Sequence, residues 1–113
     1  MSRILIADEA STVLAENLIL AESTWDRMRG LLGRDQLDAE TAMLLRPCKS
    51  IHMWFMRFPI DAAFIDKEMK VLKIARHLGP WQLAFGPRKT HCVLEAASGA
   101  LSKLKPGDRL RIE

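Results

Sequence analysis

The side chains best suited to chemistry lie in one apolar run, residues 51–66 (IHMWFMRFPIDAAFID). Among eleven apolar side chains it places an imidazole (His52), a guanidinium (Arg57) and a carboxylate (Asp61). Pro59 favours a bend between Arg57 and Asp61, because proline donates no ladder hydrogen bond and restricts the residue before it. In one interpretation the two charges pair and brace the bend, since an unpaired buried charge is costly. In the other, Arg57 binds an anionic ligand and Asp61 holds its orientation.

Three further residues extend this candidate pocket. Glu95 ends an apolar run, where it either caps a following helix or joins a polar cluster with Arg34 or Arg57. Trp81 follows Gly79-Pro80 and is a candidate for an exposed aromatic contact to a sugar or peptide. His52 is either a satisfied core histidine or a polar wall. We predict a small-ligand-binding site near the Pro59 bend, formed by His52, Arg57, Asp61, Glu95, Arg34 and Trp81.

No residue pattern in the chain is typical of an enzyme or a metal site. Cys48 and His52, followed by the adjacent His91 and Cys92, have the residue types of a zinc site but not its usual ligand spacing, and neighbouring strand residues face opposite ways. A Cys-His nucleophilic pair lacks a third, orienting residue. We therefore expect no metal and no cofactor, and we lean against catalysis. The two cysteines are expected to be reduced thiols.

Composition indicates a single globular domain spanning residues 1–113. Hydrophobic residues make up 49% and charged residues 27%, which excludes a disordered chain. The net charge of +3 comes from cations spread among nearly as many acids, so we expect no specific nucleic-acid binding. The longest uninterrupted apolar segment is far shorter than the roughly 20 residues of a membrane helix. Without an apolar signal segment either, we expect a cytoplasmic protein with no membrane partner.

Branched apolar runs separated by turn residues indicate a mainly β protein. Thr24 looks like the N-cap of a helix that carries one apolar face and ends at Gly33. A second short helix is expected over 97–104, and a long loop over 77–90. The strand over 51–58 is apolar on both faces and should be central. Strands are expected at residues 3–7, 12–20, 42–46, 51–58, 60–65, 69–75, 91–95 and 109–112. The predicted fold class is mainly β with two short helices, as a small barrel or a jelly-roll-like sandwich.

An ordered set of landmarks resembles a family known as domain of unknown function 192. They are Thr24, Arg27, Gly30-Leu31-Leu32 with Arg34, Met43-Leu44-Leu45, residues 51–56, residues 57–61, residues 63–66, Val93-Leu94-Glu95, Gly99 and Gly107-Asp108. These span nearly the whole chain. The resemblance implies a compact β-rich fold with a helix near its start, and it implies no established activity. The function stays unknown at this point, with a small-ligand-binding module as the first hypothesis. The alternative is an accessory domain that docks a protein partner without a small-molecule site.

Overall fold

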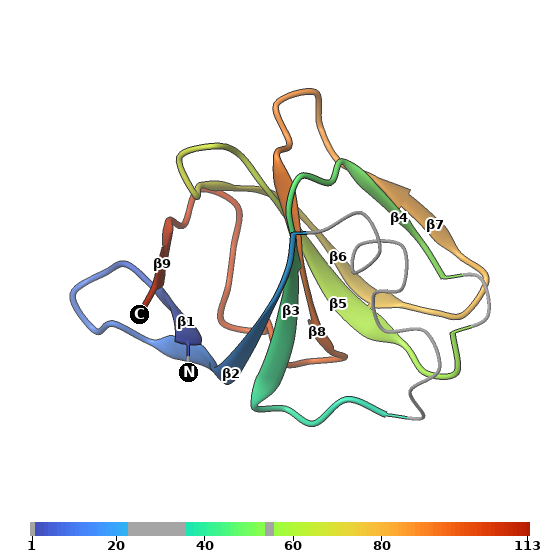
Figure 1. Cartoon of the computed structure of the whole chain (residues 1–113), viewed down its shortest axis with the longest axis horizontal. Helices are drawn as coiled ribbons and strands as arrows, with labels where there is room; N and C mark the ends of the chain where they lie inside the picture. Colours follow the sequence, from blue (N-terminus) through green and yellow to red (C-terminus); the bar gives the residue numbers. More distant parts are fainter. Residues whose placement is uncertain (1, 23–35, 54–55) are drawn as a thin grey trace.

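The computed structural model describes residues 2–22, 36–53 and 56–113, which form two β-sheets (Figure 1). The large sheet has seven strands in the order β6-β5-β8-β3-β2-β1-β9, and β4 and β7 form a small second sheet. The strands are β1 (Ser2–Ile6), β2 (Val13–Ala21), β3 (Thr41–Leu45), β4 (Ser50–His52), β5 (Ile60–Ile65), β6 (Val71–Leu78), β7 (Leu83–Phe85), β8 (Cys92–Ala97) and β9 (Leu110–Ile112).

The large sheet is mixed and curls toward closure. The predicted hairpin near the amino terminus is confirmed, because β1 and β2 pair antiparallel. By contrast, β2 and β3 pair parallel, with Asn17 opposite Thr41. At the far edges an antiparallel bridge joins Lys70 to Arg109, next to β6 and β9, and the Val71 amide donates to the Asp108 carbonyl at 2.8 Å. These contacts join one end of the two edges, so the sheet is a half-barrel.

The two faces of the large sheet bury separate apolar clusters. One face packs Leu44, Ala63 and Leu94 against Leu101 and Leu104 of the segment after β8. The opposite face packs other side chains of the same strands under the small sheet, with Met43, Phe64 and Val93 meeting Ile51 and Ala84. Because successive residues of a strand face opposite ways, a shift of one residue moves a side chain from one cluster to the other.

The predicted fold class is wrong in its helices. The described residues contain strands and turns only, so the fold is all-β within that part of the chain. The helix expected to begin at Thr24 lies outside the described residues. Among the residues that the structure describes, no helix is long and apolar enough to cross a membrane.

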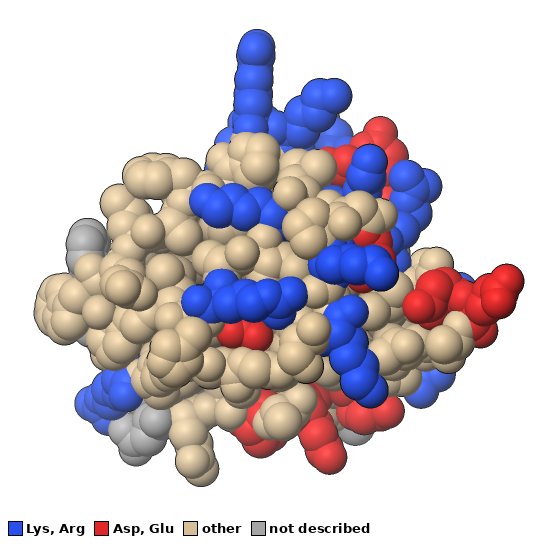
Figure 2. Space-filling model, turned by 180° about the vertical axis from the view of Figure 1, so that it is seen from behind, with Lys and Arg blue, Asp and Glu red and all other residues tan. Residues whose placement is uncertain are grey.

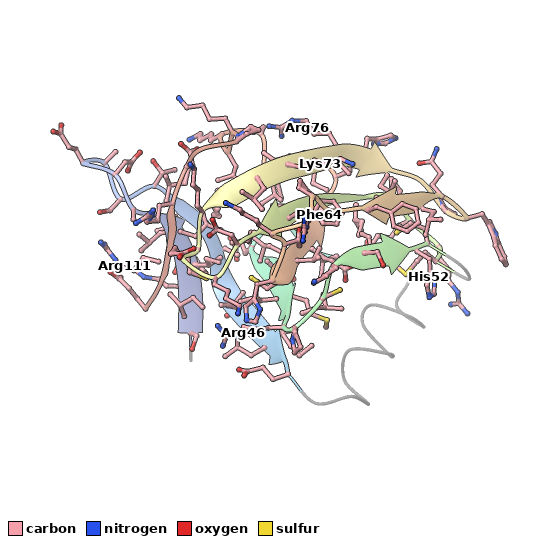
Figure 3. The ribbon with its side chains drawn as sticks, turned by 90° about the horizontal axis from the view of Figure 1, so that it is seen from above. Arg46, His52, Phe64, Lys73, Arg76 and Arg111 are labelled. Carbon is pink, nitrogen blue, oxygen red and sulfur yellow. The ribbon has the colours of Figure 1, made fainter. Side chains whose placement is uncertain are left out.

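Tertiary contacts replace the second predicted helix with three tight turns. The amides of Ala100, Ser102 and Leu104 donate to carbonyls three residues earlier, and Gly99 has a φ of +87°, outside the helical region. Arg76 of β6 donates to the carbonyls of Leu101 at 2.9 Å and Leu104 at 2.6 Å (Figure 3). These partners are distant in sequence, so local propensity did not reveal them.

Two strand predictions are also corrected. The central strand expected over 51–58 is instead the short β4 of the small sheet, and the strand buried on both faces is β5. The expected loop over 77–90 contains the end of β6 and the whole of β7. Ile51, Met53 and Met56 pack over the large sheet rather than belong to it, and a run apolar on both faces is consistent with either position.

Candidate ligand-binding site

Asp61 is a buried anchor for the backbone rather than a partner of Arg57. Its side chain is on β5, with only 2% of the residue exposed. Oδ1 accepts the His77 amide at 2.9 Å, and Oδ2 accepts the amides of Gly99 at 3.0 Å and Leu101 at 3.4 Å. No ion pair joins Asp61 to Arg57, although both lie in the described part of the chain. The carboxylate therefore ties β6 and the turns after β8 to the sheet.

Glu95 lies on the other face of the sheet. It shares its strand parity with Val93, which belongs to the cluster under the small sheet, and it stands between Met43 of β3 and Ala62 of β5. The residue is 7% exposed, and desolvation raises the pKa of its carboxyl to about 7. No helix follows β8 in the described residues, so the capping interpretation is excluded.

Two of the remaining predicted site residues lie at one end of the small sheet. His52 is exposed on β4, opposite Leu83 of β7 (Figure 3). The Trp81 amide donates to the Met53 carbonyl at 2.8 Å, which places Trp81 beside the end of β4. Arg57 is exposed, and Arg34 lies outside the described residues. The structure therefore brings His52 and Trp81 to the same end of the small sheet, whereas Asp61 and Glu95 lie on opposite faces of the large sheet.

Sequence reasoning missed a hollow formed where three segments meet. Its volume is about 470 Å³, within the range of small-molecule sites. Its walls come from the residue before β4, the β5–β6 turn and the loop after β7, at the upper end of the molecule in Figure 1. The lining residues are Lys49, Asp66, Lys67, Glu68, Arg88, Lys89, Thr90 and His91. The basic pair Arg88-Lys89 was the only sequence signal, and alone it is typical of a solvated surface.

Backbone hydrogen bonds fix the three walls relative to one another. The Gly86 amide donates to the Lys49 carbonyl at 2.8 Å, and the His91 amide donates to the Ile65 carbonyl at 2.7 Å. Cys48 donates its amide to the His91 carbonyl at 2.9 Å. One oxygen of Asp66 accepts two amides of its own turn, those of Glu68 and Lys70, both at 2.9 Å. The hollow is therefore built before any ligand arrives, which lowers the entropic cost of binding.

The charges around the hollow favour an anion. Four cations face two carboxylates, which gives a formal charge of +2 when His91 is neutral. One of these carboxylates, Asp66, already accepts hydrogen bonds from its turn. Figure 2 shows Lys and Arg side chains gathered over the top and the middle of the rear face. A concave site with a net positive charge concentrates anions near its walls.

Thr90 lines the hollow, but its hydroxyl is buried. The residue is 2% exposed, and its hydroxyl has no hydrogen-bond partner in the described structure. The hydroxyl lies against Gly86, where an added Cβ would collide with it and come within 2.6 Å of the Phe64 ring. A buried hydroxyl without a partner is destabilising, so Thr90 is a weak point in the wall of the hollow.

The two cysteines differ in burial. Cys48 is partly exposed and Cys92 is buried, and both are free in this structure; that they are reduced stays a prediction. Burial raises the pKa of the Cys92 thiol to about 11, which leaves little thiolate at neutral pH. Within residues 2–22, 36–53 and 56–113, no group of three His, Cys, Asp or Glu side chains is arranged to hold a metal ion.

Two solved structures share this fold. A protein of unknown function from Novosphingobium aromaticivorans is 23% identical, with a TM-score of 0.84 over 96% of this chain and 83% of that one. A putative transcription regulator from Sinorhizobium meliloti is also 23% identical, with a TM-score of 0.80 over 97% of this chain and 92% of that one. Similarity at this level of identity shows a common fold alone.

The family comparison is more specific than the structural one. Curated proteins gave no match. The family model DUF192, described as "Uncharacterized ACR", matches residues 5–112, which confirms the resemblance seen in the sequence landmarks. The chain belongs to the DUF192 family.

Proposed function

We propose that the protein is a small binding module that takes an anionic ligand in the hollow between β4, the β5–β6 turn and the loop after β7. The observation that carries this proposal is the preformed cavity with four cations in its walls. A ligand site near the Pro59 bend stays a prediction. It has less support, because Asp61 is committed to backbone amides and Glu95 faces the opposite side of the sheet from Asp61.

The mix of Arg and Lys favours phosphate or carboxylate groups. Arg88 can present two parallel N–H donors to one such group, whereas Lys49, Lys67 and Lys89 supply point charges. A compact polyanion such as pyrophosphate or citrate matches both the volume and the charge of this site.

The test is a thermal-unfolding titration with pyrophosphate at constant ionic strength, because a ligand that binds only the folded state raises Tm. We expect a saturable rise in Tm for the wild-type protein. The double variant R88E/K89E should lose roughly ten-fold or more in affinity, since two attractive charges become repulsive. The matched control is K103E/K105E, which reverses two exposed cations outside the hollow and should keep the affinity within about two-fold.

Two results would overturn the proposal. One is a wild-type Tm that does not respond to millimolar pyrophosphate or citrate. The other is an equal loss of affinity in both double variants, which would show attraction by the overall charge of the protein rather than binding in the hollow.

A further inference from the structure

Strand β7 presents an apolar face to solvent, which we call the β7 stripe and define as Trp81, Leu83 and Phe85. These three residues are 58%, 48% and 61% exposed, whereas Ala84 between them is buried against the large sheet. Both faces of β7 are therefore apolar, whereas a covering sheet usually turns polar residues outward. Large apolar side chains grouped on a surface mark an interaction site more often than single ones do.

The backbone holds the tip of the stripe outward. Trp81 lies in the β6–β7 connection with a φ of +67°, a conformation that is costly for a residue with a side chain. Its amide is fixed by the Met53 carbonyl at 2.8 Å, and Gln82 closes the turn by donating to Gly79 at 3.2 Å. Such strain persists only where the surrounding structure imposes it, so the exposure of the indole is built into the connection.

Only cations flank the stripe along the chain. Residues 69–94, which contain β6 and β7, include no Asp or Glu, and the same is true of residues 46–60 around β4. Lys73 of β6 donates its Nζ to the Phe85 carbonyl at 2.9 Å, at the edge of the stripe (Figure 3). Arg88 and Lys89 follow in the adjoining loop. The charge of this region is therefore complementary to an anionic partner.

The shape and the area favour a lipid surface over a folded protein. Three side chains offer a few hundred Å² of apolar area, well below the roughly 800 Å² per partner of a stable protein interface. Strand β7 lies at the flank of the molecule in Figure 1, and the side chains of the stripe are exposed to solvent there. A membrane interface needs no matching pocket, and it favours Trp beside apolar side chains, with Lys and Arg near the headgroup phosphates.

We propose that the β7 stripe docks the protein reversibly on an anionic membrane surface, with Trp81, Leu83 and Phe85 inserted among the lipids and Lys73 and the 86–89 loop facing the headgroups. This is a peripheral contact that requires no membrane-spanning segment. It uses side chains that the proposed anion site does not, because Trp81, Leu83 and Phe85 do not line the hollow, whereas Arg88 and Lys89 of the 86–89 loop belong to both surfaces.

The experiment is sedimentation of the full chain with vesicles of phosphatidylcholine alone or with about one quarter phosphatidylglycerol, the latter a typical anionic lipid. We expect binding to the anionic vesicles that weakens as salt is added. The double variant W81A/F85A should lose roughly ten-fold or more in partitioning, because the buried apolar area falls. The matched control is L20A, which shortens an exposed apolar side chain on β2 that is 39% exposed and outside the stripe.

The outcomes separate this proposal from other uses of the stripe and from the anion site. W81A/F85A should keep the wild-type Tm response to pyrophosphate, which also shows that it is folded. Equal partitioning of wild type and W81A/F85A would overturn the proposal. A wild-type protein that does not bind anionic vesicles at low salt would also overturn it. Self-association that W81A/F85A abolishes, without vesicle binding, would also overturn it and would identify the stripe as a protein interface.

Discussion

Asp61 and Glu95 lie on adjacent strands but on opposite faces of the large sheet. In the β5–β8 register Asp61 stands opposite Ala96, and Glu95 stands opposite Ala62. The two carboxylates are therefore one position out of phase, and strand geometry sends them to different clusters. Asp61 accepts backbone amides on one face of the large sheet, while Glu95 is buried on the other face. The sequence analysis placed both acids in one candidate site, but they lie in separate environments in the structure.

Removal of the Asp61 carboxylate should destabilise the protein strongly. D61A leaves the amides of His77, Gly99 and Leu101 without their acceptor, and buried donors without partners cost about 1–3 kcal/mol each. We expect a loss of about 3–5 kcal/mol in the free energy of unfolding, measured by urea denaturation. D38A is the control, because Asp38 accepts a single exposed amide, that of Glu40. Losses of similar size in both variants would contradict the anchoring role of Asp61.

The stability of the folded protein should decrease as pH rises, because of Glu95. Its folded-state pKa of about 7 exceeds the ordinary value of 4.5, so the folded protein binds more protons than the unfolded chain between these pH values. The free energy of unfolding should therefore fall as pH rises from 4.5 to about 7, by about 3 kcal/mol for this group. E95Q should abolish this part of the pH dependence and be more stable than wild type at pH 8. Parallel stability–pH curves for the two proteins would refute this assignment.

Replacement of Thr90 by valine should separate stability from ligand binding. Valine has nearly the same shape and removes the buried hydroxyl that has no partner in the described structure. We expect T90V to gain about 1 kcal/mol in the free energy of unfolding without ligand and to keep the wild-type response to pyrophosphate, because the hydroxyl is buried away from the hollow. Chemical denaturation with and without pyrophosphate measures both effects. A destabilised T90V would indicate that the hydroxyl is needed by the fold itself.

The two thiols should react at different rates in the folded protein. Cys92 is fully buried, and burial raises its pKa to about 11, whereas Cys48 is partly exposed and its thiol donates to the Ser50 carbonyl at 3.1 Å. Reaction requires an accessible thiolate, so an alkylating reagent should modify Cys48 first and Cys92 only when the chain unfolds. Mass spectrometry over time measures the rates, with C48S as the control. Equal native rates for the two thiols would contradict the burial of Cys92.

The candidate site shows where prediction from sequence reached its limit. His52, Arg57 and Trp81 were grouped with Asp61 and Glu95 because all are polar or aromatic residues near apolar strands. The structure brings His52 and Trp81 to one end of the small sheet and sends Asp61 and Glu95 to opposite faces of the large one. Register decides this grouping, and register depends on pairings between strands that are distant in sequence.

The sequence by itself determined the family and most of the strands. Alternation, branched side chains and turn residues act over a few neighbouring positions, so they are readable in a single chain. The tertiary structure alone decided that residues 98–104 are turns, because Asp61 and Arg76 bind their amides and carbonyls from other strands. It also decided that Lys49, Lys67 and Arg88 line one hollow, since segments far apart in sequence meet only when the sheet curls.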